Sequence, residues 1–314
     1  MLALILSIFL FVFIFGVCIG SFLNVVILRA LSGESIVFPA SKCPKCQNAL
    51  KWYHNIPILS YLFLRGKCAY CKDRISLQYP IVEFVTGLAF VATFLKFGLG
   101  FKVFFVWAIC SMFIVLAMTD IKEKVIFVRH AYILLGLACL MSLLNLNPLY
   151  KGVTEVLGFE IYTSVVQSFL GIILGIVIME ILARVGYLFA GTRAFGEGDT
   201  YIAACMGALF GWRGFVYAII LSVIIQLFFT VPLFIKKLLN RKDYITLATI
   251  FVFVGAIILN RMAWVPFALS VILLFASAGY LCYRLLKDMR GEGDLMYLPF
   301  GPAMLLASFI LLML

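Results

Sequence analysis

Long apolar runs separated by short polar stretches dominate the pattern of this chain. Most of the runs reach or approach the roughly 20 residues that an α-helix needs to cross about 30 Å of hydrocarbon. The ten predicted segments are 2–27, 80–96, 103–119, 131–146, 161–183, 200–211, 215–235, 245–260, 264–283 and 296–314. The pattern therefore predicts an all-α polytopic membrane protein with about 8–10 transmembrane helices.

The composition supports this prediction. Hydrophobic residues make up 65% of the chain and charged residues only 12%, whereas soluble globular proteins carry about 25% charged residues. A soluble fold of this length would need far more polar side chains to coat its surface, so soluble classes of protein are excluded.

The net charge of +11 indicates membrane topology and not a nucleic-acid partner. Of the 25 Lys and Arg residues, 20 fall in five alternate loops between the predicted helices, as the positive-inside rule requires of cytosolic loops. These loops are 29–78, 120–130, 184–199, 236–243 and 284–294. We therefore predict an N-terminus outside and membrane lipid as the surroundings, and we expect no nucleic-acid partner.

Only one of the predicted loops is large. Residues 29–78 are far more polar than the rest and form a cytosolic module between a first transmembrane helix at 1–28 and a multi-helix membrane domain at 79–314. Two CxxC pairs, separated by 21 residues, lie within this loop. The four cysteines are Cys43, Cys46, Cys68 and Cys71.

This spacing is typical of a zinc ribbon. Each CxxC pair turns two thiolates around one ion, and two such pairs complete a tetrahedral shell of four sulfurs. The alternative is a pair of exchangeable disulfides, but a reducing cytosol disfavours stable disulfides. A four-thiolate zinc site has no open coordination position, so the zinc is predicted to be structural and catalysis must lie elsewhere.

Carboxylates beside spanning helices are candidates for that catalysis, because burying one in hydrocarbon costs several kcal/mol unless it is paired or faces water. Asp120 ends the third predicted segment and Asp199 precedes the sixth, which puts both at the cytosolic boundary. Two neighbouring carboxylates share a proton, so one can activate water while the other hydrogen-bonds the attacked carbonyl. Each aspartate taken alone is also compatible with a plain polar helix end.

The glycines beside the second aspartate strengthen it as a candidate. Gly196 and Gly198 allow close approach of the backbone next to Asp199. The same four letters, Gly-Glu-Gly-Asp, recur at 291–294, so spacing alone leaves Asp294 open as an alternative.

The sequence resembles the type IV prepilin peptidases, which are the leader peptidases of bacterial pilus, type II secretion and competence systems. Near the N-terminus the matching elements are residues 16–27, the two CxxC pairs with Trp52 and residues 55–61 between them, and residues 79–83. Farther along the chain they are residues 195–199, 207–212 and 298–302. In this family the aspartate ahead of the final-helix element 298–302 is not catalytic. The resemblance therefore favours Asp199 over Asp294 as the partner of Asp120.

The resemblance implies an aspartic endopeptidase embedded in the bacterial inner membrane. It would remove the short basic leader of prepilin or pseudopilin substrates at the cytosolic boundary, with Asp120 and Asp199 as the catalytic pair. Gly196, Gly198 and Glu83 would support the substrate or the active site. The resemblance also implies N-methylation of the new amino terminus, with S-adenosylmethionine as cofactor.

The chain departs from the family pattern in three places. The first catalytic motif normally continues as Ile-Pro, and here Phe127 follows Ile126. The second normally has Lys two positions after its aspartate, where this chain has Tyr201. Residues 236–290 match nothing in the usual eight-helix pattern and are interpreted as an inserted segment.

Other classes of function fit these residues less well. In an ion- or proton-coupled transporter, Glu83, Glu180 and the aspartates would form a path through the membrane. Transporters place broken helices near the midplane in repeated halves, whereas the aspartates here share one membrane face and no repeat is visible. A membrane thiol oxidoreductase would need its CxxC pairs on the oxidising side, against the charge pattern.

Overall fold

Helices make up most of the described chain. The computed structural model describes residues 2–38, 41–144, 154–156, 159–161, 164–190, 196–259, 272–273, 275–277, 279–280 and 299–314. Five of the described helices are long and apolar enough to cross a membrane. They are α1 (Leu2–Ser32), α3 (Gln78–Phe97), α4 (Phe101–Glu123), α6 (Val165–Ala190) and α7 (Glu197–Asn240). The predicted all-α membrane fold is confirmed.

The remaining described elements are shorter. Three apolar helices are α5 (Val128–Leu143), α8 (Tyr244–Leu259) and α10 (Gly301–Met313). The loop after α1 contains a 3-10 helix, η1 (Trp52–Asn55), and one short helix, α2 (Leu59–Phe63). A single antiparallel hairpin joins β1 (Thr154–Val156) to β2 (Phe159–Ile161).

Two predicted segment boundaries differ from the structure for local reasons. α1 continues past residue 28 to Ser32 and ends at Gly33, whose φ of +72° and the bond from Glu34 N–H to Arg29 O (3.1 Å) form a glycine-terminated helix end. The segment predicted from residue 161 begins as a helix only at Val165, and Ile161 itself belongs to a β-hairpin.

The long helix α7 contains a break. Its 44 residues would measure about 66 Å as one straight helix, twice the thickness of the hydrocarbon. Gly211, with a φ of 67° and ψ of 179°, is non-helical and divides it. The break falls on the last residue of the predicted segment 200–211, shortly before the predicted segment 215–235.

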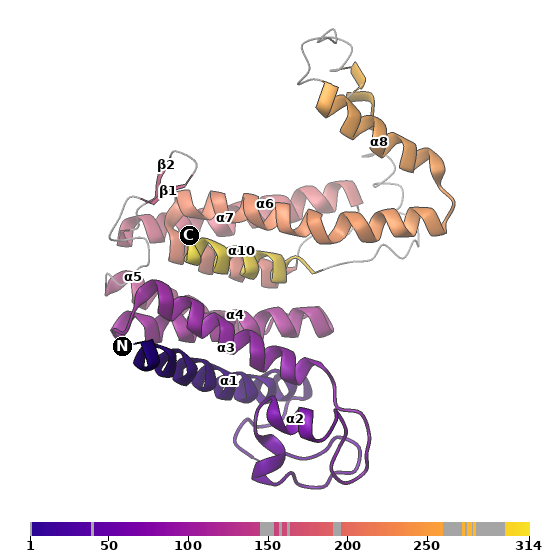
Figure 1. Cartoon of the computed structure of the whole chain (residues 1–314). Helices are drawn as coiled ribbons and strands as arrows, with labels where there is room; N and C mark the ends of the chain where they lie inside the picture. The colour runs from indigo at the N-terminus through magenta and orange to yellow at the C-terminus, as the bar shows by residue number, and fades with distance from the viewer. Residues whose placement is uncertain are drawn as a thin grey trace. The chain divides into compact units, whose positions relative to one another are not determined.

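The chain divides into two compact units. The first comprises Met1–Ile178, Glu197–Ser222 and Pro299–Leu314, and the second comprises Met179–Gly196 and Val223–Leu298. Within the first unit α3 packs against both α1 and α4, and α4 also contacts α5 and α10. Figure 1 shows α1, α3 and α4 lying side by side, with the loop that carries α2 at one end of them.

Glycines bring α6 and the start of α7 together backbone to backbone. A Cβ atom added at Gly171 or Gly207 would overlap the backbone of the other residue, and one added at Gly175 would lie 2.6 Å from Ala203 O. Small residues allow this close approach of membrane helices. The packing fixes the first half of α7, which carries Asp199.

Candidate active site and metal centre

Asp120 lies in the last turn of α4 and is buried, with 4% of its surface exposed. The helix ends just after it at Lys124, whose left-handed backbone directs its N–H to Asp120 O at 2.9 Å. The Oδ2 atom of Asp120 is buried and has no hydrogen-bond partner among the described residues. This oxygen is a buried polar atom whose hydrogen-bonding capacity the described residues leave unused.

Asp199 lies in the first turn of α7 and is also 4% exposed. It is close enough to Asp120 for the two carboxylates to repel each other electrostatically. A helix N-terminus stabilises negative charge, because its first N–H groups have no partner within the helix. The structure thus brings together the two aspartates that the sequence singled out.

The N-terminus of α10 is the third helix end at this site. The backbone N–H of Gly301 hydrogen-bonds the carboxylate of Asp120. A Cβ atom added at Gly301 would overlap Asp120 Oδ2 and lie 3.2 Å from Ile202 Cδ1. Only glycine therefore leaves room for α10 to approach both aspartate-bearing helices.

Gly198 has a similar steric role. A Cβ atom added there would overlap the Cβ of Ile126 and lie 2.7 Å from its Cδ1. Ile126 follows α4 and also faces Gly301, whose added Cβ would lie 3.3 Å from Ile126 Cδ1. The exposed residue Gly196 precedes α7 directly.

The two departures from the family motifs fit this geometry. Phe127 precedes α5 with a φ of −72°, which lies within the range that proline adopts. Its backbone therefore has the conformation that the family's proline would impose. Tyr201 packs edge-to-face against Tyr132 of α5, with ring centroids 5.4 Å apart, and thus ties α7 to α5.

The four cysteines of the loop form one cluster. Their sulfur atoms all lie within 4.8 Å of one another, and Cys43 Sγ is 3.9 Å from Cys71 Sγ. Four thiolates around a tetrahedral zinc ion, with Zn–S bonds of about 2.3 Å, have sulfurs roughly 3.8 Å apart. The donor set and spacing therefore fit such an ion.

Both CxxC pairs adopt the same turn. Gln47 N–H donates to Cys43 O at 2.9 Å, and Lys72 N–H donates in the same way to Cys68 O at 3.1 Å. The residue after each pair has a left-handed backbone, with a φ of 56° at Gln47 and 61° at Lys72. Backbone N–H groups of Cys71 and Tyr70 hydrogen-bond Cys68 and lower the pKa of its thiol to about 7, which favours the thiolate that metals bind.

Glu83 connects the membrane helices to the cysteine loop. It is buried in α3, and its Oε2 accepts a hydrogen bond of 2.7 Å from the N–H of Ile58. Ile58 has a φ of 58°, which is rare and strained for a β-branched residue. The described contacts of Glu83 thus hold the start of α2, and its side chain also hydrogen-bonds Ser21 of α1.

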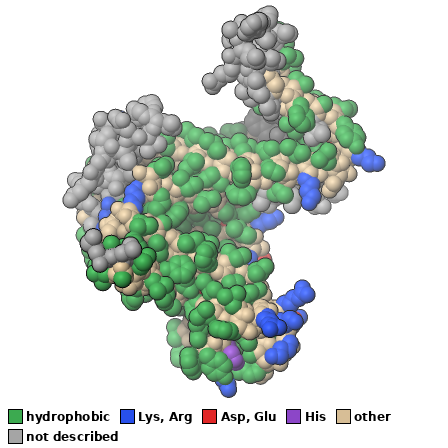
Figure 2. Space-filling model, viewed as in Figure 1, with side chains coloured by type: hydrophobic (Ala, Val, Ile, Leu, Met, Phe, Trp, Pro, Cys, Tyr) green, Lys and Arg blue, Asp and Glu red, His purple; other side chains and the backbone are tan. Residues whose placement is uncertain are grey.

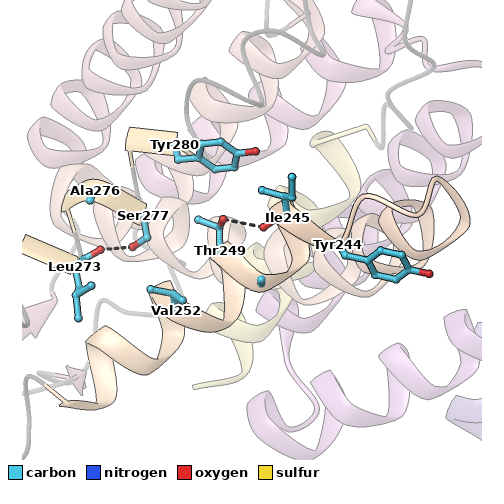
Figure 3. A pocket seen from close by; sticks show the side chains of 9 residues that line it. Tyr244, Ile245, Thr249, Val252, Leu273, Ala276, Ser277 and Tyr280 are labelled. Atoms are coloured by element: carbon cyan, nitrogen blue, oxygen red, sulfur yellow. Dashed lines mark hydrogen bonds between the residues drawn. The ribbon is translucent and has the colours of Figure 1, made fainter.

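The second unit contains an apolar cavity of about 540 Å³ between α8 and the described residues of 272–280. Figure 3 shows its lining, which includes Tyr244, Ser277 and Tyr280 and none of the predicted catalytic residues. This cavity lies within the segment 236–290, which the sequence analysis interpreted as inserted. Asp294, the alternative aspartate, lies outside the described residues.

Comparison with known proteins identifies the family. Residues 14–97 match the model of the bacterial peptidase A24 N-terminal domain, and residues 107–231 match that of the type IV leader peptidase family. Relatives named prepilin leader peptidase/N-methyltransferase occur in Klebsiella pneumoniae and Bacillus subtilis (strain 168). They are 30% and 31% identical to this chain over 68% of its length, and the chain covers 89% and 78% of theirs. The chain belongs to the type IV leader peptidase family.

A similarly named protein of Myxococcus xanthus (strain DK1622) is 34% identical over 65% of this chain, which spans 56% of that relative. No solved structure matches the chain. The family and the helices together make this peptidase a multi-pass inner-membrane protein. The comparisons confirm the predicted family and give no support to a transporter.

Sequence reasoning missed two positions at the site. Gly301 was part of a family element but was not assigned a role, although a Gly-Pro pair at a helix start is a local signal for a tight N-terminus. Ile126 was noted only as the residue before Phe127. Its contact with Gly198 joins segments far apart in the chain, and a sequence pattern does not reveal such a contact.

Replacing Gly301 with Ala should misplace the Asp120 carboxylate, because the new methyl group overlaps Oδ2. Displacements of about 1 Å at a catalytic group cost up to roughly 100-fold in rate, so we expect prepilin cleavage by Gly301→Ala to fall 10- to 100-fold by this estimate. Gly136→Ala is the matched control, because a Cβ atom there meets nothing within 4 Å. Equal rates for the two variants would contradict the proposed packing.

Replacing Glu83 with Ala should loosen the start of α2. The half-buried N–H of Ile58 would lose its acceptor, at a cost of about 1–3 kcal/mol when such a group is left without a partner. We expect amide hydrogen exchange of a peptide spanning residues 56–63 to quicken by about ten-fold. Glu83→Gln, which keeps an acceptor oxygen, should exchange more slowly than Glu83→Ala; the reverse order would show that the hydrogen bond does not hold this turn.

Proposed function

We propose that this protein cleaves the short basic leader from prepilin-like substrates, using Asp120 and Asp199 at the cytosolic membrane boundary. The observation that supports it most strongly is the meeting of the two buried aspartates at the ends of α4 and α7. The names of the relatives state the same activity for those proteins. The substrates follow from this resemblance and are prepilins or pseudopilins.

The reaction is general acid–base hydrolysis. One carboxylate of the pair is ionised and takes a proton from a water molecule, which then attacks the scissile carbonyl. The other is protonated and hydrogen-bonds the carbonyl oxygen as negative charge develops on it. When the tetrahedral intermediate collapses, the C–N bond breaks and the leaving amine receives a proton from the pair.

The remaining residues of the site hold this arrangement. The N–H of Gly301 fixes the orientation of the Asp120 carboxylate, and the contact between Gly198 and Ile126 holds α7 close to the end of α4. Because a prepilin has a basic leader in the cytosol and an apolar helix in the bilayer, its scissile bond lies at the depth of these helix ends. The N-terminus would then be outside and the cysteine loop cytosolic.

The cysteine cluster serves a structural role in this proposal. Cys43, Cys46, Cys68 and Cys71 would hold one zinc ion, whose closed shell of four thiolates supplies cross-linking and no chemistry of its own. Such an ion stabilises a loop that has few buried apolar residues.

Methylation of the new amino terminus is a second proposed activity, with S-adenosylmethionine as methyl donor. It rests on the names of the relatives. Among the described residues there is no glycine-rich turn between a strand and a helix, the common way of holding a nucleotide-like cofactor, so no residue is assigned to this step.

Asp120→Asn and Asp199→Asn should each lower prepilin cleavage by at least about 100-fold, because an amide cannot transfer the shared proton. Cleavage is measured with purified, reconstituted protein and a prepilin that carries its leader. Asp294→Asn is the control and should keep most of its activity. If Asp294→Asn alone were inactive, the pair would have been assigned to the wrong Gly-Glu-Gly-Asp element.

Cys68→Ser should lower the zinc content of the purified protein from about one equivalent to nearly none, since a shell of three thiolates binds zinc far more weakly. Cys18→Ser is the control, because Cys18 is an exposed cysteine of α1, outside the cluster. Metal is measured by elemental analysis. A cross-link between Cys43 and Cys46 in protein isolated from cells, with no bound metal, would instead favour the redox interpretation.

A further inference from the structure

The cysteine module, defined here as residues 41–77, exposes an apolar surface that nothing in the described chain covers. Its members are Trp52, Leu59, Leu62 and Phe63. Trp52 is 79% exposed and Phe63 is 83% exposed, values that are unusual for two large side chains within one short segment. Exposed apolar side chains of this size commonly mark a surface that binds a protein or a membrane.

These four side chains lie on adjoining elements. Leu59, Leu62 and Phe63 are spaced by three and four residues along α2 and therefore share one face of it. Trp52 belongs to η1, which packs against α2. The four exposed side chains thus lie on two short elements that are in contact.

The orientation of Trp52 is supported by a row of rings in edge-to-face contact. Trp52 packs edge-to-face on Tyr53 at 5.6 Å between centroids, and Tyr53 packs on His54 at 4.5 Å. His54 in turn packs on Tyr70, between the second pair of cysteines, at 5.5 Å. The row connects the exposed indole to the cysteine cluster.

The module is strongly basic. Its only acidic residue is Asp73, which forms a salt bridge of 3.0 Å with Lys45. Seven basic side chains are exposed: Lys42, Lys45, Lys51, Arg65, Lys67, Lys72 and Arg74. In Figure 2 the blue side chains gather at the right-hand edge of the module, and green ones continue from its left side toward the spanning helices.

Aromatic and aliphatic side chains beside lysine and arginine are the combination that binds a membrane interface, where rings enter the headgroup region and cations meet anionic lipid. The chain enters the module from α1 and leaves it into α3, both of which are apolar enough to span the bilayer. Headgroups are therefore within reach. The basic leader of a prepilin carries the same charge as the module and would be repelled.

We propose that the cysteine module docks through Trp52, Leu59, Leu62 and Phe63 onto the anionic surface of the membrane in which its own helices lie. The apolar side chains enter the interface, and the exposed lysines and arginines of the module hold phosphate headgroups. This docking fixes the module against the bilayer independently of peptide cleavage.

Quenching of Trp52 fluorescence by brominated phospholipids tests this proposal. The full-length protein is placed in nanodiscs of phosphatidylcholine with and without phosphatidylglycerol, and the signal of Trp52 is the difference between wild type and Trp52→Phe. We expect lipids brominated near the headgroup end of their chains to quench Trp52, more strongly when phosphatidylglycerol is present. Aqueous iodide should quench it weakly in those discs.

A matched pair of lysine variants tests the role of charge. Each basic residue near an anionic surface contributes about 1 kcal/mol, so Lys51→Gln should lower the ratio of docked to undocked Trp52 by roughly five-fold. Lys102→Gln, at the opposite end of α4 from Asp120, loses the same charge and should leave the ratio unchanged. Equal effects of the two variants would overturn the electrostatic part of the proposal.

Two further outcomes would overturn it altogether. One is a Trp52 signal that iodide quenches freely and brominated lipids do not, in both kinds of disc. The other is shielding of Trp52 that occurs only after a prepilin is added, which would make these side chains a binding surface for protein.

Discussion

The cost of burying two carboxylates beside one another governs the architecture around Asp120 and Asp199. Each is almost fully buried at a helix end, and a buried carboxylate is costly unless polar groups contact it. Three helix termini meet there, and the N–H of Gly301 offsets part of the cost. Only glycine leaves room for the side chains that pack on Gly198 and Gly301 and for the close approach of the α6 and α7 backbones.

The cysteine module is too small to be stabilised by a hydrophobic core. A loop of this size buries too little apolar surface to fold by itself, and a metal site or a disulfide commonly supplies the missing stability. Here the two CxxC turns bring four sulfurs together, and Glu83 anchors the strained Ile58 to the membrane helices. Large side chains that would form a core in a bigger domain are left on the surface, where lipid can cover them.

Where the chain departs from the family motifs, the local backbone conformation can be kept although the residue differs. Phe127 keeps a proline-like φ at the start of α5, so the turn after Asp120 is preserved without the ring that normally enforces it. Tyr201 replaces a lysine and contacts Tyr132. Both changes leave the aspartates in place.

The sequence alone determined the features that depend on local chemistry. Apolar runs predicted the spanning helices because a helix in lipid satisfies its own backbone hydrogen bonds, and the spacing of Cys43, Cys46, Cys68 and Cys71 predicted their cluster. The sequence also predicted that Asp120 and Asp199 lie at helix ends, as they do in the structure. Only the tertiary structure showed that Gly301 contacts Asp120, that Ile126 contacts Gly198 and that Glu83 contacts Ile58. Contacts between distant segments depend on how whole helices pack, and no periodic pattern in the sequence predicts them.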